Sequence, residues 1–448
     1  MAFSVSFEND YFGLVEILDR SGIPVMAEER RGGGWPVVVV GGIAPTLNPE
    51  PLAEIVDIFL LGEAEEIFPA FLDAFADNFG KRSRGRKEAA LENLDTAVSG
   101  SPGVYIPRTV ATRYDSDGHF DGFETKPEFQ PPSAADVNRS PTESRIVSPL
   151  AHFRGLFLTE VARGCPHRCR FCIVASDERN YRIRNTQLLL ESVDRGLRIA
   201  GAVGLVGSAV LSHPGIIKMM ELVAAAGGRL GLSSVRLNAV TSELAQWLAA
   251  CRLKSVTAAP EAASFHLRKL IGKPMTDDTV LGGLEVLSRT GVGRIKLYFM
   301  VGFPGESDKD AAAVPGLVAN IRRLLPPGVK LNISVSPFVP KPGTPLRRAA
   351  MADRAILKSR LGLIRSGLAA LDGVEMGTVS IREAMIEGLL SRGDRRLGRW
   401  LEHMVRSGGN RFRSLPDFGV DPGWLNAPWE EGRPLPGELT APVLSANP

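Results

Sequence analysis

Three of the four cysteines in this chain lie within eight consecutive residues. Cys165, Cys169 and Cys172 form the pattern Cys-x3-Cys-x2-Cys. Three thiolates on one short loop can bind three irons of a [4Fe–4S] cluster, because soft sulfur ligands suit such clusters. The fourth iron then has no cysteine nearby and stays open, which is what a catalytic metal site needs. The spacing therefore indicates a catalytic cluster.

A zinc site is the alternative for the same thiols, completed by His167 or by Cys251. Cys251 ends a predicted helix over residues 242–251, which favours a buried apolar cysteine. Cations of the cysteine loop would help to keep its thiolates ionised. These cations are Arg163, Arg168 and Arg170.

Strands and helices alternate regularly from Gly155 onward. Short apolar runs predict strands over residues 156–162, 203–207, 230–235, 255–259, 294–301 and 330–337. Helical patterns lie over residues 188–200, 214–226, 242–251, 263–271, 277–288 and 309–325. Six such units predict a partial (β/α)6 barrel of the TIM type, with its site at the carboxyl ends of the strands. The cysteine loop follows the first of them.

The chain before this barrel reads as an incomplete Rossmann-like α/β domain over residues 1–80. Its predicted strands are 3–7, 36–40 and 56–61, and its predicted helices are 11–21, 51–55 and 63–79. Residues 81–150 read as a linker in which 104–106 and 109–114 form a small hairpin. The barrel occupies 151–348, a small helical C-terminal region 349–420, and a Pro-rich tail 421–448.

Composition and charge set the class of protein. The 448 residues are 44% hydrophobic and carry a formal charge of +3, which is too small to indicate nucleic-acid binding by itself. No apolar run reaches the roughly 18 residues of a membrane helix, and the N-terminus lacks a signal-peptide pattern. Four cysteines exclude a disulfide scaffold. We expect a cytoplasmic protein.

A basic run, Lys81–Lys87, leaves a different class of function open. It reads either as a solvated linker or as a nucleic-acid contact. Together with the arginine-rich C-terminal region it would support a non-catalytic metal-cluster RNA-binding module. No recognised RNA-binding motif accompanies it.

The cysteine pattern, its place after the first strand and Phe171 before the third cysteine resemble the radical S-adenosylmethionine (SAM) superfamily. The resemblance implies that the open iron binds the amino and carboxylate groups of SAM. It implies that the reduced cluster cleaves SAM to methionine and a 5′-deoxyadenosyl radical. Hydrogen abstraction from a substrate follows, with methyl transfer as a further outcome, and an electron donor such as flavodoxin or ferredoxin is required.

Short motifs after the predicted strands are similar to the SAM-contacting motifs of that family, in the same order. The stretch Leu205–Ala209 lacks the acidic residue often found there, whereas Phe299–Glu306 and Phe338–Pro345 are close matches. The resemblance assigns cofactor binding to Phe171, Gly207, Ser208, Arg236, Glu261, Ser264, Val301, Gly302 and Pro340.

The N-terminal segment resembles the second half of the cobalamin-binding domain that precedes many radical SAM barrels. The resemblance rests on Val37–Gly42, Asn48–Leu52 and Val56–Glu66. It implies cobalamin as a further cofactor, although the Asp-x-His-x-x-Gly motif that supplies a lower ligand is absent. The alternative is a domain that only packs against and shields the barrel. Half the domain is missing, so either the chain starts late or its true start lies upstream.

Residues 1–164 contain no cysteine, so the second cluster of a methylthiotransferase is not expected.

Several polar residues near the predicted strands have two possible roles each. His213 and His266 are either polar groups over a substrate pocket or ordinary helix-start or surface histidines. Lys296 either contacts substrate or pairs with a buried carboxylate. The run Ser391–Arg396 either clamps an anionic substrate or caps helices and faces solvent.

Overall fold

The computed structural model describes residues 1–32, 34–79, 87–124, 131–134, 136–139, 141–175, 181–408 and 412–439. The chain divides into two compact units. The barrel unit comprises Asp136–Phe338 and Ala352–Ile381, and the terminal unit comprises Met1–Ala135, Val339–Met351 and Arg382–Pro448. The five-segment division expected from the sequence stays a prediction. The basic run Lys81–Arg86 lies outside the described residues.

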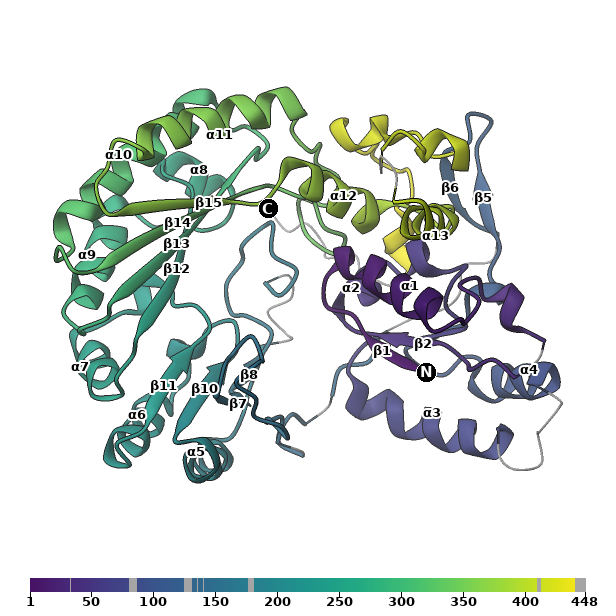
Figure 1. The fold of residues 1–448 in the computed structure, drawn as a ribbon, viewed down its shortest axis with the longest axis horizontal. Coiled ribbons are helices and arrows are strands. Elements are labelled where there is room, and N and C mark those ends of the chain that lie inside the picture. The colour runs from purple at the N-terminus through teal and green to yellow at the C-terminus, as the bar shows by residue number, and fades with distance from the viewer. Residues whose placement is uncertain are drawn as a thin grey trace. The chain divides into compact units, whose positions relative to one another are not determined.

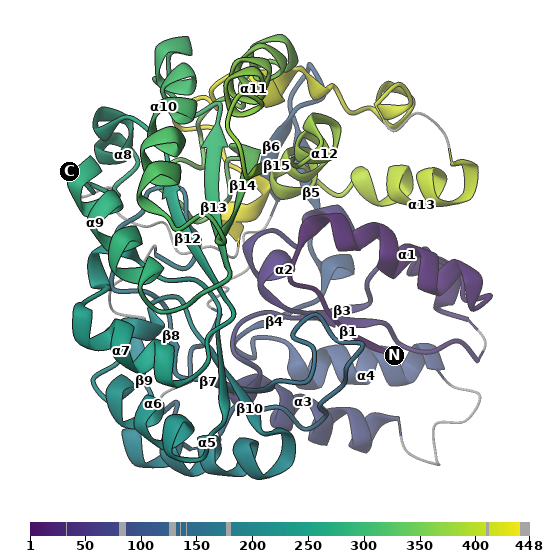
Figure 2. The same cartoon turned by 60° about the vertical axis from the view of Figure 1, so that its left-hand side comes forward.

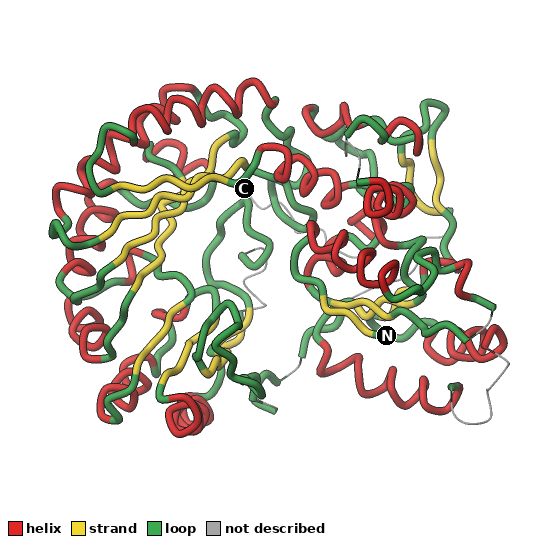
Figure 3. Tube along the Cα trace, viewed as in Figure 1, coloured by secondary structure: helices red, strands yellow, loops and turns green. Residues whose placement is uncertain are grey.

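The barrel unit is a curved sheet of parallel strands with every helix on its outer side (Figures 1 and 3). Its strands are β7 (Phe157–Glu160), β10 (Ala202–Val206), β11 (Arg229–Leu232), β12 (Ser255–Glu261), β13 (Arg294–Val301), β14 (Lys330–Pro337) and β15 (Val374–Thr378). They pair in the orders β11-β10-β7 and β12-β13-β14-β15, and a parallel bridge from Val235 to Ala258 joins the two groups.

The helices that connect these strands are α5 (Thr186–Ala200), α6 (Ile216–Ala225), α7 (Ser242–Ala250), α8 (Phe265–Leu270), α9 (Asp277–Ser288), α10 (Asp308–Leu324) and α11 (Arg354–Leu368). Side-chain caps fix where several of them begin, as expected for Ser and Thr at this position. Thr241 caps α7, Thr276 caps α9, and Ser307 forms a reciprocal capping box with Asp310 at α10. The predicted (β/α)6 partial barrel is confirmed, and β15 adds a seventh strand within the region expected to be helical.

Alternation along the central strands separates a buried face from a partly exposed face. In β13, Ile295, Leu297, Phe299 and Val301 are buried, whereas Lys296, Tyr298 and Met300 are not. The same alternation runs along β14. Because the helices cover the outer side (Figure 1), the partly exposed residues line the inner face.

The terminal unit is a small sheet between two layers of helices (Figures 1 and 2). Strands β1 (Ala2–Ser4), β2 (Val39–Gly41) and β3 (Ile58–Leu60) are parallel, and β4 (Val104–Tyr105) is antiparallel to β3. One face packs against α1 (Tyr11–Arg20) and α13 (Leu397–Ser407), with Trp400 fully buried. The other packs against α3 (Ala64–Asn78) and α4 (Lys87–Val98). The unit also contains α2 (Ile43–Leu47) and α12 (Ile381–Arg392).

Two expectations for the predicted linker are wrong. Residues 104–106 do not form a hairpin with 109–114, because β4 pairs with β3 as the edge of the sheet. The hairpin instead joins β5 (Thr112–Tyr114) to β6 (Phe120–Phe123). Helix α4 was not expected there. It forms because Leu91 and Leu94 are buried against the sheet.

Candidate active site

The cysteine loop leaves the barrel directly after its first strand, β7. Strands β8 (Ala162–Arg163) and β9 (Arg182–Ile183) pair in antiparallel fashion at its two ends. Cys165 and Cys169 are buried, with 7% and 8% of their surface exposed, and Cys172 is half-buried. The thiols pack with Phe171, Ala175 and, from the loop after β10, Ala209. The structure therefore gathers all three predicted metal ligands in one cluster.

The three thiols influence one another electrostatically. Burial raises the pKa of Cys165 and of Cys172, and the charge of Cys169 raises both pKa values further. Three neighbouring thiolates repel each other unless a cation lies between them, so the donor set fits a bound metal cluster.

The segment after α8 holds the cysteine loop by its backbone. The N–H of Arg170 donates to the carbonyl oxygen of Ile271 at 2.9 Å. At Gly272, with φ of +76°, an added Cβ would lie only 2.2 Å from the carbonyl oxygen of Arg168. Glycine is therefore required where these two backbones meet.

Cations from the segments after β11 and after α8 lie beside the thiols. The Arg236 guanidinium lies 3.8 Å from the Cys169 sulfur. The charges of Arg236 and Lys273 both oppose the rise in the pKa of Cys165 that burial causes. Arg163, expected in this role, forms an ion pair with Glu160 at 3.0 Å. The loop thus meets cations supplied by other segments.

Glu261 lies at the end of β12 in a strained backbone conformation. It has φ of +66° and is 8% exposed, and its carboxylate accepts a hydrogen bond from Lys273 at 2.9 Å. Burial raises the pKa of Glu261, and the charges of Lys273 and Arg236 oppose that shift. Non-glycine residues with positive φ persist where the surrounding structure fixes them, often at functional sites.

Aromatic rings connect the cysteine loop to the last two predicted motifs. The Phe171 ring lies 5.7 Å from that of Phe303, which lies 5.0 Å from that of Phe338. Directly before Phe303 on the chain, buried Val301 ends β13 and Gly302 follows with φ of +90°. The motifs after β13 and β14 therefore meet the metal-ligand loop.

The remaining predicted cofactor residues differ in their surroundings. The carbonyl oxygen of Gly207 accepts a hydrogen bond from Ser233 at 3.0 Å, and Ser208 is exposed. Ser264 caps α8 and hydrogen-bonds to Asp310 at 2.6 Å. Pro340 belongs to the terminal unit. The cofactor roles of these residues stay predictions.

The alternative zinc site loses one of its two candidate ligands. Cys251 is fully buried, and its sulfur donates to the carbonyl oxygen of Met220 at 3.2 Å. It precedes β12, at the end of the strands opposite to the cysteine loop. His167 remains beside the thiols, and its Nε2 is buried without a partner among the described residues.

The two barrel histidines with open alternatives, His213 and His266, lie in different environments. His213 is buried, with both ring nitrogens bonded to backbone atoms of Arg184 and Gly215 at 2.9 Å. This is a structural histidine at the start of a helix. His266 is exposed on α8. Neither environment indicates that His213 or His266 is a polar group over a substrate pocket.

Lys296 lies in a polar row that crosses the inner face. Its ammonium stacks on the ring of Tyr298 at 4.6 Å from the centroid, and no ion pair to a described carboxylate accompanies it. Its neighbours in register are Thr257, Asn332 and, one strand further, Glu375. Asn332 donates to Glu375 at 2.8 Å. Sequence reasoning missed Asn332 and Glu375, because only strand register brings them together.

In the terminal unit, the sheet edge expected to hold cobalamin is filled by the chain itself. Open α/β sheets bind ligands outside the carboxyl ends of their strands. A Cβ at Gly62, after β3, would lie 2.7 Å from the carbonyl oxygen of Pro132. Asn48, at the end of α2, donates to the carbonyl oxygens of Ser391 and Gly393 at 3.0 and 2.9 Å. The residues present therefore do not fit a bound cobalamin.

Comparisons with known proteins give the following findings. Residues 1–107 match the family model described as "Radical SAM proteins, N-terminal", and residues 159–314 match that of the radical SAM superfamily. Together they cover more than half of the chain. The uncharacterised protein MJ0966 of Methanocaldococcus jannaschii is 25% identical over 403 residues, 89% of this chain and 79% of that one.

Solved structures resemble the chain more distantly. The cobalamin-dependent S-adenosylmethionine radical enzyme OxsB matches with a TM-score of 0.45 and 16% identity, over 71% of this chain. Coproporphyrinogen III oxidase (HemN) from Escherichia coli matches with a TM-score of 0.35 and 11% identity, over 47% of this chain. The matches span 43% and 51% of those proteins. Within the described ranges, no helix combines the length and apolar character that crossing a membrane requires.

Proposed function

Because this chain belongs to the radical SAM superfamily, we propose that its barrel unit holds a [4Fe–4S] cluster on Cys165, Cys169 and Cys172 and binds SAM beside it. The observation that carries the proposal is the gathering of these three thiols, without Cys251, at the carboxyl ends of the strands. When bound, the reduced cluster supplies the electron that cleaves SAM to methionine and a 5′-deoxyadenosyl radical. A one-electron donor such as flavodoxin or ferredoxin would reduce it.

The chain's own residues contribute charge balance and positioning. Arg236 and Lys273 place positive charge beside the three thiolates and so oppose their mutual repulsion. Lys273 also fixes the carboxylate of Glu261, which is an acceptor for the SAM amino group in this proposal. The rings of Phe171, Phe303 and Phe338 keep water from that side of the loop.

The inner face of the barrel defines the substrate side of the site. Ser334 and Ser336 lie on this face toward the carboxyl end of β14, in register with Tyr298 and Met300 of β13, whereas Lys296 and Asn332 lie nearer the amino ends of the two strands. Hydrogen-bonding groups on this face favour a polar substrate, held for hydrogen abstraction. We include no cobalamin-dependent methyl transfer, because the terminal sheet edge is filled by Pro132 and the segment after α12.

The test of this function is anaerobic. The full chain is loaded with iron and sulfide, reduced with dithionite and given SAM, and 5′-deoxyadenosine is measured by mass spectrometry. We expect 5′-deoxyadenosine and four irons per chain in the wild type. Cys169→Ala should lose both the brown chromophore and SAM cleavage.

Cys251→Ala is the matched control, because it removes a thiol that lies outside the cluster. It should keep the iron content and the cleavage activity of the wild type. Zinc in place of iron, or intact SAM cleavage in Cys169→Ala, would refute the proposal.

A further inference from the structure

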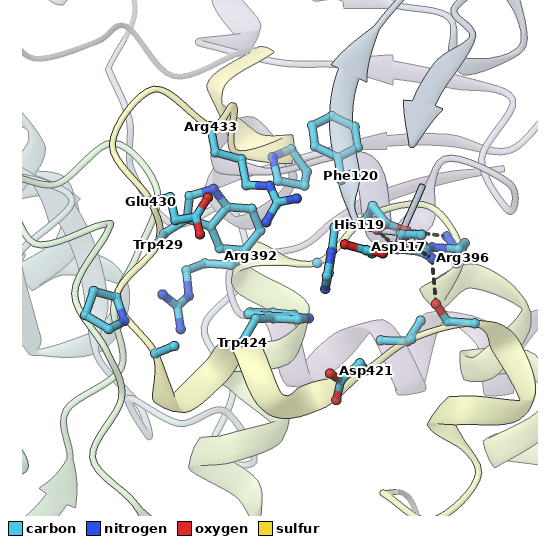
Figure 4. Close-up of a pocket in the computed structure, with 18 residues that line it drawn as sticks. Asp117, His119, Phe120, Arg392, Arg396, Asp421, Trp424, Trp429, Glu430 and Arg433 are labelled. Atoms are coloured by element: carbon cyan, nitrogen blue, oxygen red, sulfur yellow. Dashed lines mark hydrogen bonds and ion pairs between the residues drawn. The ribbon is translucent and has the colours of Figure 1, made fainter. Parts of the chain in front are cut away.

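The terminal unit contains a cavity that the proposed radical chemistry does not use. It encloses about 160 Å³ between the β5–β6 hairpin, the end of α12 and the residues after α13. Figure 4 shows the Arg392, Trp424 and Trp429 side chains gathered around it, with His119 and Phe120 on another wall. All these residues belong to the terminal unit.

Arg392 differs from the other arginines of this cavity. Arg396 forms an ion pair with Asp394 at 2.7 Å, and Arg433 forms one with Asp115. Arg392 is fully buried, and it pairs with no carboxylate of the described residues. Among the described residues, its guanidinium donates to the carbonyl oxygens of Ala349 and Leu425, at 3.0 and 3.3 Å.

Two buried donors of this cavity lack acceptors. The Nε–H of Arg392 and the indole Nε1–H of Trp429 have no partner among the described residues. A buried donor without an acceptor is costly, and a buried cation without a counter-ion costs more. A carboxylate in the cavity would offer acceptor oxygens to these donors and a negative charge to the guanidinium.

Aromatic surface forms the rest of the cavity. The rings of Trp424 and Trp429 lie 5.5 Å apart at 75°, and the Arg392 guanidinium lies 5.3 Å from the Trp424 ring. Phe120, which is buried, lines another wall of the cavity (Figure 4). Such walls favour a ligand with a flat apolar body attached to its charged group.

Carboxylates at the rim limit the charge of the ligand. Asp117, Asp421 and Glu430 line the cavity, and all three are exposed to solvent. They would repel a multiply charged phosphate more strongly than a single carboxylate. A monoanion is therefore favoured.

We propose that this cavity binds a small aromatic carboxylate, with the carboxylate held by Arg392 and Trp429 and the ring packed against Trp424 and Phe120. The sequence alternative in which Ser391–Arg396 caps helices and faces solvent is wrong, because none of these residues is exposed and Arg396 at the start of α13 makes no side-chain cap. Arg395 pairs with buried Glu50 at 2.9 Å and Arg396 with Asp394, whereas Arg392 is left for an anion.

The test is calorimetric titration of the full chain with phenylacetate and with its neutral analogue phenylacetamide. Phenylacetate should bind at least about tenfold more tightly, because a hydrogen bond to a charged group contributes about 1.5–3 kcal/mol. Arg392→Met should lose at least about tenfold in phenylacetate affinity. Trp429→Phe, which keeps the ring but removes its donor, should lose about threefold or more.

Arg406→Met is the matched control, because Arg406 lies on α13 outside the cavity and pairs with Asp19 at 2.9 Å. It should bind as the wild type does. Trp429→Phe keeps the proposal testable if Arg392→Met does not fold. Equal affinity for the two ligands, tighter binding of phenylphosphonate, unchanged affinity in Trp429→Phe, or no binding at millimolar phenylacetate would overturn the proposal.

Discussion

Gly272→Ala tests whether the segment after α8 fixes the cysteine loop. Gly272 has φ of +76°, and its new Cβ would lie 2.2 Å from the carbonyl oxygen of Arg168. Gly291→Ala is a control with nearly the same φ, +75°, and nothing lies within 4 Å of the added atom. The two variants therefore share the conformational cost and differ in the contact.

The expected magnitudes follow from these two terms. A left-handed alanine costs about 1–2 kcal/mol, and about 0.4–1 kcal/mol returns through the less flexible unfolded chain. Gly291→Ala should thus lose about 1 kcal/mol of unfolding free energy. Gly272→Ala must also move the Arg168 carbonyl away, and such overpacking costs about 1–3 kcal/mol more.

Two measurements separate the variants. Urea unfolding should place Gly272→Ala below Gly291→Ala in stability. Reconstitution should load less iron onto Gly272→Ala, because Arg168 lies between two cysteine ligands and its displacement moves them. Equal stability and equal iron content in the two variants would refute the role of this contact.

Two further predictions concern buried charge. Lys273→Met leaves the Glu261 carboxylate buried without its ion-pair partner and should lower the free energy of unfolding in urea by about 3–5 kcal/mol. The double variant Lys273→Met/Glu261→Gln should restore most of that loss. Equal losses in the single and the double variant would contradict this prediction. Burial, assisted by the charge of Asp394, raises the pKa of Tyr114 to about 12 from 10.0. The folded state then keeps a proton that the unfolded state releases, so stability should fall as pH rises from about 10 to about 12. Tyr114→Phe should lessen that slope, and an unchanged slope would exclude Tyr114 as its source.

Local patterns in the sequence predict the central barrel well. Residues 294–301 and 330–337 alternate so regularly that the predicted and observed strands coincide. Strand β15 was missed because Val374–Thr378 contains a glycine and has no buried residue. Its pairing with β14, not its own composition, makes it a strand.

The site was predictable where it depends on spacing and not where it depends on distant contacts. The three cysteines were found because they share one loop. Lys273 lies about a hundred residues further along the chain and carries no motif. Its proximity to the thiols depends on the path of the chain after β12. Arg392 likewise stands in a run of arginines whose separate partners only tertiary structure distinguishes.

The terminal unit is assembled from both ends of the chain, and this has a consequence during protein synthesis. Its core packs α1 and the sheet against α13, so part of that core stays uncovered until residues 397–407 emerge from the ribosome. The barrel residues are made in between, which takes on the order of 10–50 s at ordinary elongation rates. During that interval Phe12 lacks its contact with the Trp400 ring, and the nascent segment depends on chaperones or on its own residual structure to avoid aggregation. A ribosome that stops before α13 would release a chain with a complete barrel and a partly exposed apolar core in the terminal unit, which proteases could recognise.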